Sequence, residues 1–103
     1  MSDTLDAYLV LSGLLFAIGS FGFLARRNAI LMLICIELML NAVNLSLVAF
    51  NAYLPDPDNI GGVFSLLVMA VAAAEATVGL ALVIAIIRTR QTPEVDEYSD
   101  LKE

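Results

Sequence analysis

The stretch AILMLICIELMLNAVNLSLVAF, residues 29–50, decides the fold of this chain. It is 22 residues long, and Glu37 is its single charged side chain. A helix crosses the hydrocarbon core of a bilayer with about 20 mainly apolar residues. Because hydrocarbon offers no partner to backbone N–H and C=O groups, such a run must satisfy them within a helix. We therefore predict a transmembrane helix over residues 29–50.

Two further apolar runs lie on either side of this stretch, at residues 7–24 and 63–87. Each is long enough to span a bilayer. The connector before the central run, residues 25–28, is short and contains two arginines, whereas residues 51–62 contain prolines and glycines that break helices. The fold class predicted is an all-α membrane protein with three transmembrane helices. Residues 1–103 then form a single membrane domain with a polar tail from residue 88.

The composition excludes several classes of function. Of 103 residues, 60% are hydrophobic and 16% are charged, against roughly 45–50% and about 25% in soluble domains. The chain has no histidine, so imidazole chemistry and the commonest metal ligand are missing. Its single cysteine cannot form an internal disulfide. A net charge of -6 with five basic residues gives no basic surface for nucleic acid.

The basic residues predict the orientation of the chain in the membrane. Lysine and arginine accumulate in cytoplasmic connectors. Here all five fall on one side of a three-helix arrangement, namely Arg26, Arg27, Arg88, Arg90 and Lys102. The N-terminus and the connector at residues 51–62 carry acids but no base. We expect the N-terminus to be extracytoplasmic and the C-terminus to be cytoplasmic.

Two glutamates, Glu37 and Glu75, lie inside the predicted spans. A charged side chain at such a depth costs about 2.5–3.5 kcal/mol on insertion scales and marks a functional site. Counted from Ala29 and Ile87 at about 1.5 Å per residue, the two glutamates lie about 12 and 18 Å from the cytoplasmic face. A depth difference of only about 6 Å allows both to belong to one proton relay.

Neither glutamate has a basic partner within the spans, since no Lys, Arg or His occurs there. A carboxyl group without a fixed counter-charge binds or releases a proton as its surroundings change. The alternative is that each glutamate only donates a hydrogen bond between helices and thereby serves assembly. The sequence leaves both interpretations open.

A polar stripe extends from Glu37 along the central helix. Asn41, Asn44 and Asn51 follow at spacings of four, three and seven residues, which place all four side chains on one helix face. Such amides can hold water or pass hydrogen bonds outward from the carboxyl group. They can also simply join one helix to another.

Three motifs resemble a known family. They are Arg26-Arg27-Asn28, the stretch IELMLNAVNL at residues 36–45, and AAAEA at residues 72–76 followed by VGL at residues 78–80. The chain resembles the NuoK family, the small three-helix membrane subunit of proton-pumping complex I, called the 4L subunit in mitochondria. The resemblance extends from about Tyr8 to Arg90.

This resemblance implies a non-redox subunit of a proton-translocating NADH:quinone oxidoreductase. Glu37 and Glu75 match the two intramembrane glutamates of the family, and Arg26 and Arg27 match its cytoplasmic arginines. The family implies no cofactor or metal on this chain, because the quinone, NADH or another electron donor, FMN and Fe–S clusters belong to other subunits. It also implies neighbours on both sides: a quinone-side subunit and antiporter-like subunits of the membrane arm.

Two other functions remain open from the sequence. One is the small C-type subunit of a multisubunit cation/proton antiporter, and the other is a purely structural assembly subunit. The second glutamate within its alanines and the segment around Glu37 favour the complex I subunit. We expect the protein in the plasma membrane of a prokaryote rather than in an organellar energy-transducing membrane.

Overall fold

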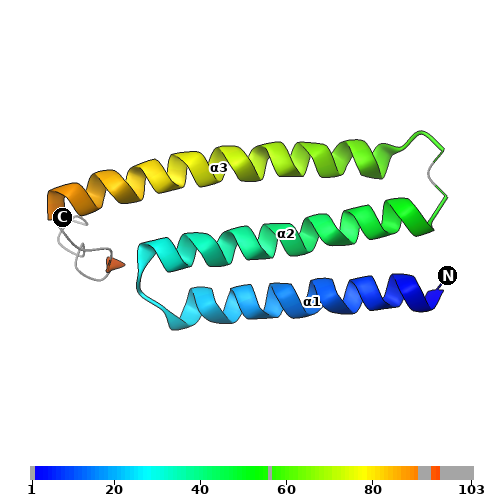
Figure 1. Cartoon of the computed structure of the whole chain (residues 1–103), viewed down its shortest axis with the longest axis horizontal. Helices are drawn as coiled ribbons and strands as arrows, with labels where there is room; N and C mark the ends of the chain where they lie inside the picture. The colour runs from blue at the N-terminus through cyan, green and yellow to red at the C-terminus, as the bar shows by residue number, and fades with distance from the viewer. Residues whose placement is uncertain (1, 56, 91–93, 96–103) are drawn as a thin grey trace.

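The computed structural model describes residues 2–55, 57–90 and 94–95, and three long helices account for nearly all of them (Figure 1). They are α1 (Ser2–Ala25), α2 (Ala29–Tyr53) and α3 (Ile60–Arg90). Each is long and apolar enough to cross a membrane. The prediction of three membrane-spanning helices is therefore confirmed.

The helices extend beyond the predicted apolar runs. Helix α2 begins after Asn28, whose side chain accepts hydrogen bonds from the backbone N–H of Ile30 at 2.9 Å and of Leu31 at 3.4 Å. It ends at Tyr53, because Leu54 is extended before Pro55, as residues preceding proline usually are. The predicted connector at residues 51–62 is thus too long at both ends, and both Asn51 and Gly62 belong to helices.

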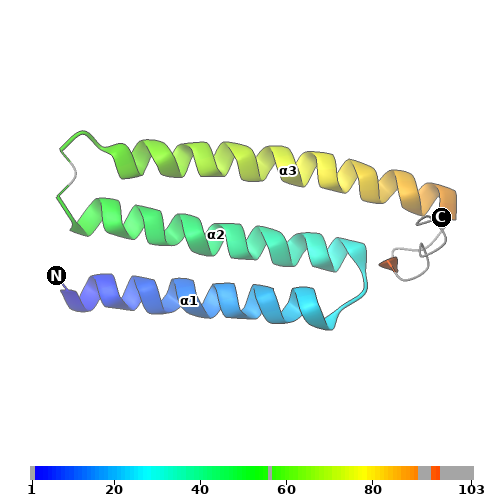
Figure 2. The same cartoon turned by 180° about the vertical axis from the view of Figure 1, so that it is seen from behind.

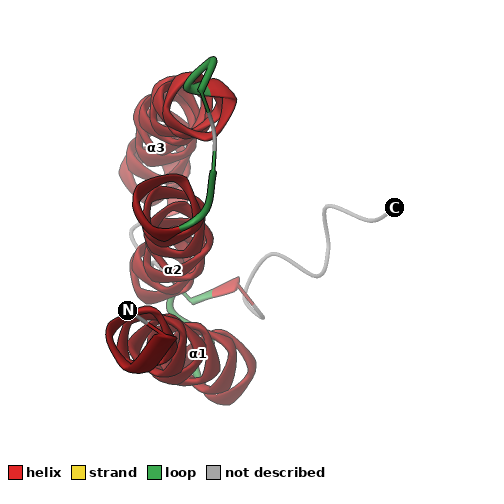
Figure 3. Ribbon diagram, turned by 90° about the vertical axis from the view of Figure 1, so that its right-hand side faces the viewer, coloured by secondary structure: helices red, strands yellow, loops and turns green. Residues whose placement is uncertain are grey.

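The three helices lie in a row, with α2 in the middle (Figures 1 and 2). Helix α2 packs against both α1 and α3, and the view along the helix axes shows the three helices in a single layer (Figure 3). Large apolar side chains such as Phe21, Leu24 and Leu66 are exposed. The two broad faces of the row are therefore covered by lipid or by other membrane proteins.

Small side chains bring α1 and α2 close together. A Cβ atom added at Gly19 would lie 2.7 Å from Met39 Cγ and 2.9 Å from the carbonyl oxygen of Cys35. Nearby, Ser12 Oγ donates a hydrogen bond to the carbonyl oxygen of Ala42. Small residues and hydroxyl groups of this kind are typical of tight helix contacts in membranes.

The α2–α3 contact has a different composition. A Cβ atom at Gly79 would lie 3.0 Å from Leu33 Cδ1, and Leu40 and Val43 of α2 line a hollow with residues of α3. On α3, the half-buried side of the helix includes Ala72 and Ala76. Leu33 thus packs against the small residue Gly79, and this contact marks the register of the two helices.

We predict that Gly19→Ala weakens the α1–α2 contact, because the backbone oxygen of Cys35 cannot move aside without moving α2. The expected loss is about 1–3 kcal/mol in the free energy of unfolding, the range for overpacked cores. The measurement is a titration with sodium dodecyl sulfate in mixed micelles. Gly13→Ala is the matched control, since an added Cβ there meets nothing within 4 Å. Equal effects of the two changes would contradict the prediction.

Candidate functional site

Glu37 lies on the side of α2 that faces α3. Cys35 and Met39 approach Gly19 of α1, and a residue two positions away in a helix is turned by about 200°. Glu37 is therefore turned away from α1. Its side chain is half-buried, and its Oε1 atom is shielded and has no hydrogen-bond partner among the described residues.

Asn44 and Asn51 repeat the situation of Glu37 further along α2. Seven residues are nearly two full helical turns, so the three side chains lie on one face at intervals of about 10.5 Å. The Oδ1 atoms of both asparagines are also shielded and without a partner in the described part of the chain. Asn41, by contrast, is exposed. Of the four residues in the predicted stripe, Glu37, Asn44 and Asn51 thus have shielded oxygen atoms, and Asn41 lies at the exposed margin of the same face.

Glu75 has different surroundings. Its side chain is exposed and lies in a shallow apolar depression of α3 that is also lined by Ala74, Val78, Gly79 and Leu82. Neither Glu75 nor Glu37 forms an ion pair within residues 2–55, 57–90 and 94–95. The exposed carboxyl group of Glu75 is accessible to a neighbouring subunit, whereas the shielded oxygen of Glu37 is not.

The register of α2 and α3 places the two glutamates at nearly the same level. Leu33 lies beside Gly79, and the helices are antiparallel (Figure 1). One turn forward along α2 leads from Leu33 to Glu37. One turn back along α3 leads from Gly79 to Glu75, and because the helices are antiparallel both steps have the same direction. The depths counted from the sequence differ by about 6 Å, because that count places Ala29 and Ile87 at the same level. In the observed register Ala29 is level with Val83, which lies four residues before Ile87. This shift of about 6 Å removes the difference in depth between the two glutamates.

The arginines lie far from both glutamates. Arg26 and Arg27 are exposed in the connector before α2, and Arg27 is ten residues, or about 15 Å, from Glu37. Arg27 instead approaches the C-terminal segment, where its Nε atom lies 3.7 Å from Glu94 Oε2. The backbone N–H of Val95 donates a hydrogen bond to the carbonyl oxygen of Arg27 at 3.0 Å. Arg27 therefore contacts the C-terminal segment at the end of the bundle, and neither arginine forms an ion pair with Glu37 or Glu75 among the described residues.

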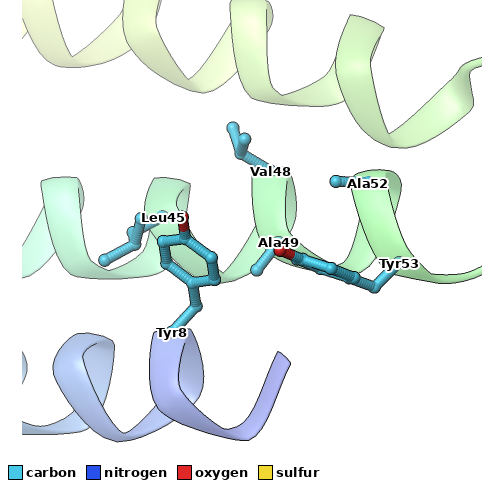
Figure 4. A pocket seen from close by; sticks show the side chains of 6 residues that line it. All are labelled: Tyr8, Leu45, Val48, Ala49, Ala52 and Tyr53. Atoms are coloured by element: carbon cyan, nitrogen blue, oxygen red, sulfur yellow. The ribbon is translucent and has the colours of Figure 1, made fainter. Parts of the chain in front are cut away.

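A small pocket lies near the opposite end of α2 (Figure 4). Its volume is about 180 Å³, and the rings of Tyr8 and Tyr53 lie beside it with centroids 6.0 Å apart. The other lining residues are Leu45, Val48, Ala49 and Ala52. The sequence alone did not predict this pocket, although tyrosines near span ends are typical of membrane interfaces. No group of three metal-ligating side chains occurs in the described part of the chain.

Comparison with known proteins shows the family of this chain. Residues 7–103 match the model of the NADH-ubiquinone/plastoquinone oxidoreductase chain 4L family. The chain belongs to this family. It is 57% identical over 99 residues to NADH-quinone oxidoreductase subunit K of Geobacillus kaustophilus (strain HTA426), covering 96% of this chain and 98% of that protein. It is 58% identical over 97 residues to the subunit K protein of Bacillus cereus (strain AH187), covering 94% and 93%.

In this member of the 4L family, we predict that cysteines at positions 33 and 79 form a disulfide on mild oxidation, with Cys35 replaced by alanine. A Cβ atom at position 79 would lie 4.0 Å from Leu33 Cγ, the position that a cysteine Sγ atom takes, so the two positions are neighbours across the contact. Cross-linking is followed by the mobility of the chain after proteolysis between the helices. The pair at positions 33 and 83 is the control, because it corresponds to the register assumed from sequence. Preferential cross-linking of the control pair would contradict the observed register.

Proposed function

We propose that this chain is a membrane-arm subunit of a proton-translocating NADH:quinone oxidoreductase and that Glu37 and Glu75 transfer protons within it. The family match and the relatives named NADH-quinone oxidoreductase subunit K support the complex. The observation that carries the proton-transfer role is the shielded Oε1 atom of Glu37, which has no partner among the described residues. The same relatives favour this complex over an antiporter of the C-subunit type.

The two glutamates differ in exposure, and this difference suits two successive steps of one proton transfer. Glu37 faces the interior of the chain, and Glu75 is exposed at about the same level. A carboxyl group without an ion-pair partner changes its protonation when a nearby charge changes, which is the property a coupling site needs. Glu75 is therefore placed to exchange a proton or respond to a charge on a neighbouring subunit, and Glu37 to continue the transfer inside this chain.

The redox chemistry belongs to other subunits in this proposal. NADH or a related donor, FMN, the Fe–S clusters and quinone bind elsewhere in the complex, and this chain is not catalytic alone. The row of helices has two broad apolar faces (Figure 3). They provide room for a quinone-side neighbour and for an antiporter-like neighbour, with lipid covering what remains.

The arrangement of charges supports the proposed orientation. Arg26 and Arg27 in the first connector and Arg88 near the end of α3 lie at one end of the bundle, and Asp58 lies in the connector at the other end (Figure 2). The positive end is the cytoplasmic end by the charge rule for membrane proteins. We place the protein in a prokaryotic plasma membrane, in keeping with its Geobacillus and Bacillus relatives.

We predict that Glu37→Gln lowers proton translocation and coupled quinone reduction by about tenfold or more, since positioned acid–base groups commonly contribute at least that much. Glutamine keeps the shape and hydrogen-bonding capacity but cannot titrate. Glu75→Gln has a milder effect, the double change has the largest, and Glu37→Asp restores part of the activity. Proton uptake and quinone reduction are measured in membrane vesicles and normalised to assembled complex.

The matched control for these variants is Glu94→Gln, which removes a carboxylate outside the spans. It is expected to leave both rates unchanged, because Glu94 pairs with Arg27 at an exposed position. Normal proton translocation in assembled Glu37→Gln complex would eliminate the proton-transfer role. It would leave a structural role in assembly as the function of the glutamates.

We also predict that a cysteine at Asp58 reacts with a membrane-impermeant thiol reagent added to intact cells, whereas a cysteine at Thr89 does not. Both positions are exposed, and they lie at opposite ends of α3. Cys35 is replaced by alanine in both variants. Permeabilised cells provide the control for reactivity, because both cysteines react once the reagent reaches both sides. The reverse pattern in intact cells would invert the proposed orientation.

A further inference from the structure

The pocket beside Tyr8 and Tyr53 has no part in the proposed proton transfer. It has a volume of about 180 Å³ and lies between α1 and the last turns of α2 (Figure 4). An apolar cavity of about 150 Å³ holds a molecule of the size of benzene. The pocket therefore has room for several carbon atoms. Apart from the two tyrosine rings, its walls are the aliphatic side chains of Leu45, Val48, Ala49 and Ala52.

The pocket forms where the contact between α1 and α2 opens. Ser12 Oγ lies 2.6 Å from Ser46 Oγ, so the helices are close at that level. One turn nearer the N-terminus, the ring of Tyr8 lies with its centroid 6.0 Å from that of Tyr53. The buried Ala49 lies between the two rings (Figure 4). Because alanine ends at Cβ, the rings border a hollow that no side chain of the described residues fills.

The pocket extends from the membrane interface toward the hydrocarbon core. Tyr53 is the last residue of α2, and tyrosines at span ends lie at the level of the lipid headgroups. Leu45 lies eight residues, or about 12 Å, deeper along the same helix. A hollow of this volume and length takes a single carbon chain, whereas a helix about 10 Å across does not fit. The acyl chain of a phospholipid has this direction and width.

The tyrosine hydroxyl groups complete a site for an amphipathic molecule. Neither hydroxyl forms a hydrogen bond with another described residue. A phenolic O–H is a hydrogen-bond donor, and the phosphate and ester oxygens of a phospholipid are acceptors at the same membrane level. The two rings therefore contribute an apolar wall to the pocket and two donors at its outer end.

The charges at this end of the chain select the headgroup. Asp3, Asp6 and Asp58 are exposed where the N-terminus and the α2–α3 connector lie side by side (Figure 1). No Lys or Arg occurs before Arg26 or between residues 28 and 87. These carboxylates repel a lipid with a net negative charge and attract an ammonium group. A primary ammonium group also donates charge-assisted hydrogen bonds to them.

We propose that this pocket binds one acyl chain of a phosphatidylethanolamine, a phospholipid with a primary ammonium headgroup. The chain lies over Ala49 and Ala52, the tyrosine hydroxyl groups donate to phosphate or ester oxygens, and the ammonium group lies near the aspartates. The lipid fills the open end of the α1–α2 contact. Neither Glu37 nor Glu75 takes part in this binding, which is independent of the proposed proton transfer.

The test uses the intact complex in phosphatidylcholine vesicles with a trace of a phosphatidylethanolamine that carries a photoreactive diazirine group in one acyl chain. After illumination, mass spectrometry of peptides identifies the labelled residues. We expect label near Tyr8 in α1 and from Leu45 to Tyr53 in α2. Absence of label at these residues, with label elsewhere on the complex, would overturn the proposal.

Ala52→Leu tests whether the acyl chain occupies the pocket. Ala52 lines the pocket but is exposed, so leucine there fills the hollow without entering the α1–α2 contact. We expect about tenfold less label, since each methylene group kept out of an apolar site costs about fourfold in affinity. Ala7→Leu is the matched control, because Ala7 is exposed at the same end and does not line the pocket. Equal labelling of the two variants would overturn the proposal.

A phosphatidylglycerol with the same photoreactive chain tests the headgroup. We expect it to label the pocket about fivefold less, the effect of one unfavourable charge near a membrane surface. The combined change Asp3→Asn, Asp6→Asn and Asp58→Asn is expected to bring the two probes to equal labelling. Equal or stronger labelling by phosphatidylglycerol in the unchanged complex would overturn the assignment of the headgroup.

A cryo-electron microscopy map of the intact complex tests the site independently of the probes. It should contain elongated density between Tyr8 and Tyr53, and a side chain of a neighbouring subunit in that place would overturn the proposal. Glu37→Gln is expected to leave the labelling unchanged. Loss of proton translocation in Glu37→Gln, together with an unlabelled pocket in the unchanged complex, would retain the proposed function and reject the lipid site alone.

Discussion

Hydrocarbon cannot form hydrogen bonds, and this constraint accounts for most of the structure. It makes each apolar run helical, so that every backbone group inside the membrane is satisfied within its own segment. It also explains why the hydroxyl group of Thr77 bonds to its own helix and why Ser12 bonds to α2. Against this background, the unpartnered oxygen atoms of Glu37, Asn44 and Asn51 mark the site.

Helix α2 has two faces with different physical properties. The face toward α1 is formed by small and adaptable side chains around Cys35, Met39 and Ala42, and it packs tightly against Gly19 and Ser12. The opposite face presents a carboxyl and two amide groups to α3. Tight packing on one face holds the helix in place, so that the polar face keeps a fixed position relative to α3.

The arrangement in a row has a consequence for the two glutamates. Because α2 lies between its neighbours, Glu37 faces a contact within the chain, whereas Glu75 on α3 remains exposed. The chain therefore presents one carboxyl group to its surroundings and keeps the other inside, at about the same level. This difference in exposure gives a physical reason for expecting unequal effects of the two glutamine substitutions.

The sequence by itself determined the three helices, the positions of the glutamates within them and the family, because hydropathy and helical spacing are local properties of a single segment. It placed Asn41, Asn44 and Asn51 on one face, but it could not show that Asn41 is exposed while the other two are shielded. It also misplaced the connector at residues 51–62, since polar Asn51 and flexible Gly62 are tolerated within helices. Only the tertiary structure decided the register of α2 and α3, because the offset between two helices depends on how Leu33 and Gly79 fit together.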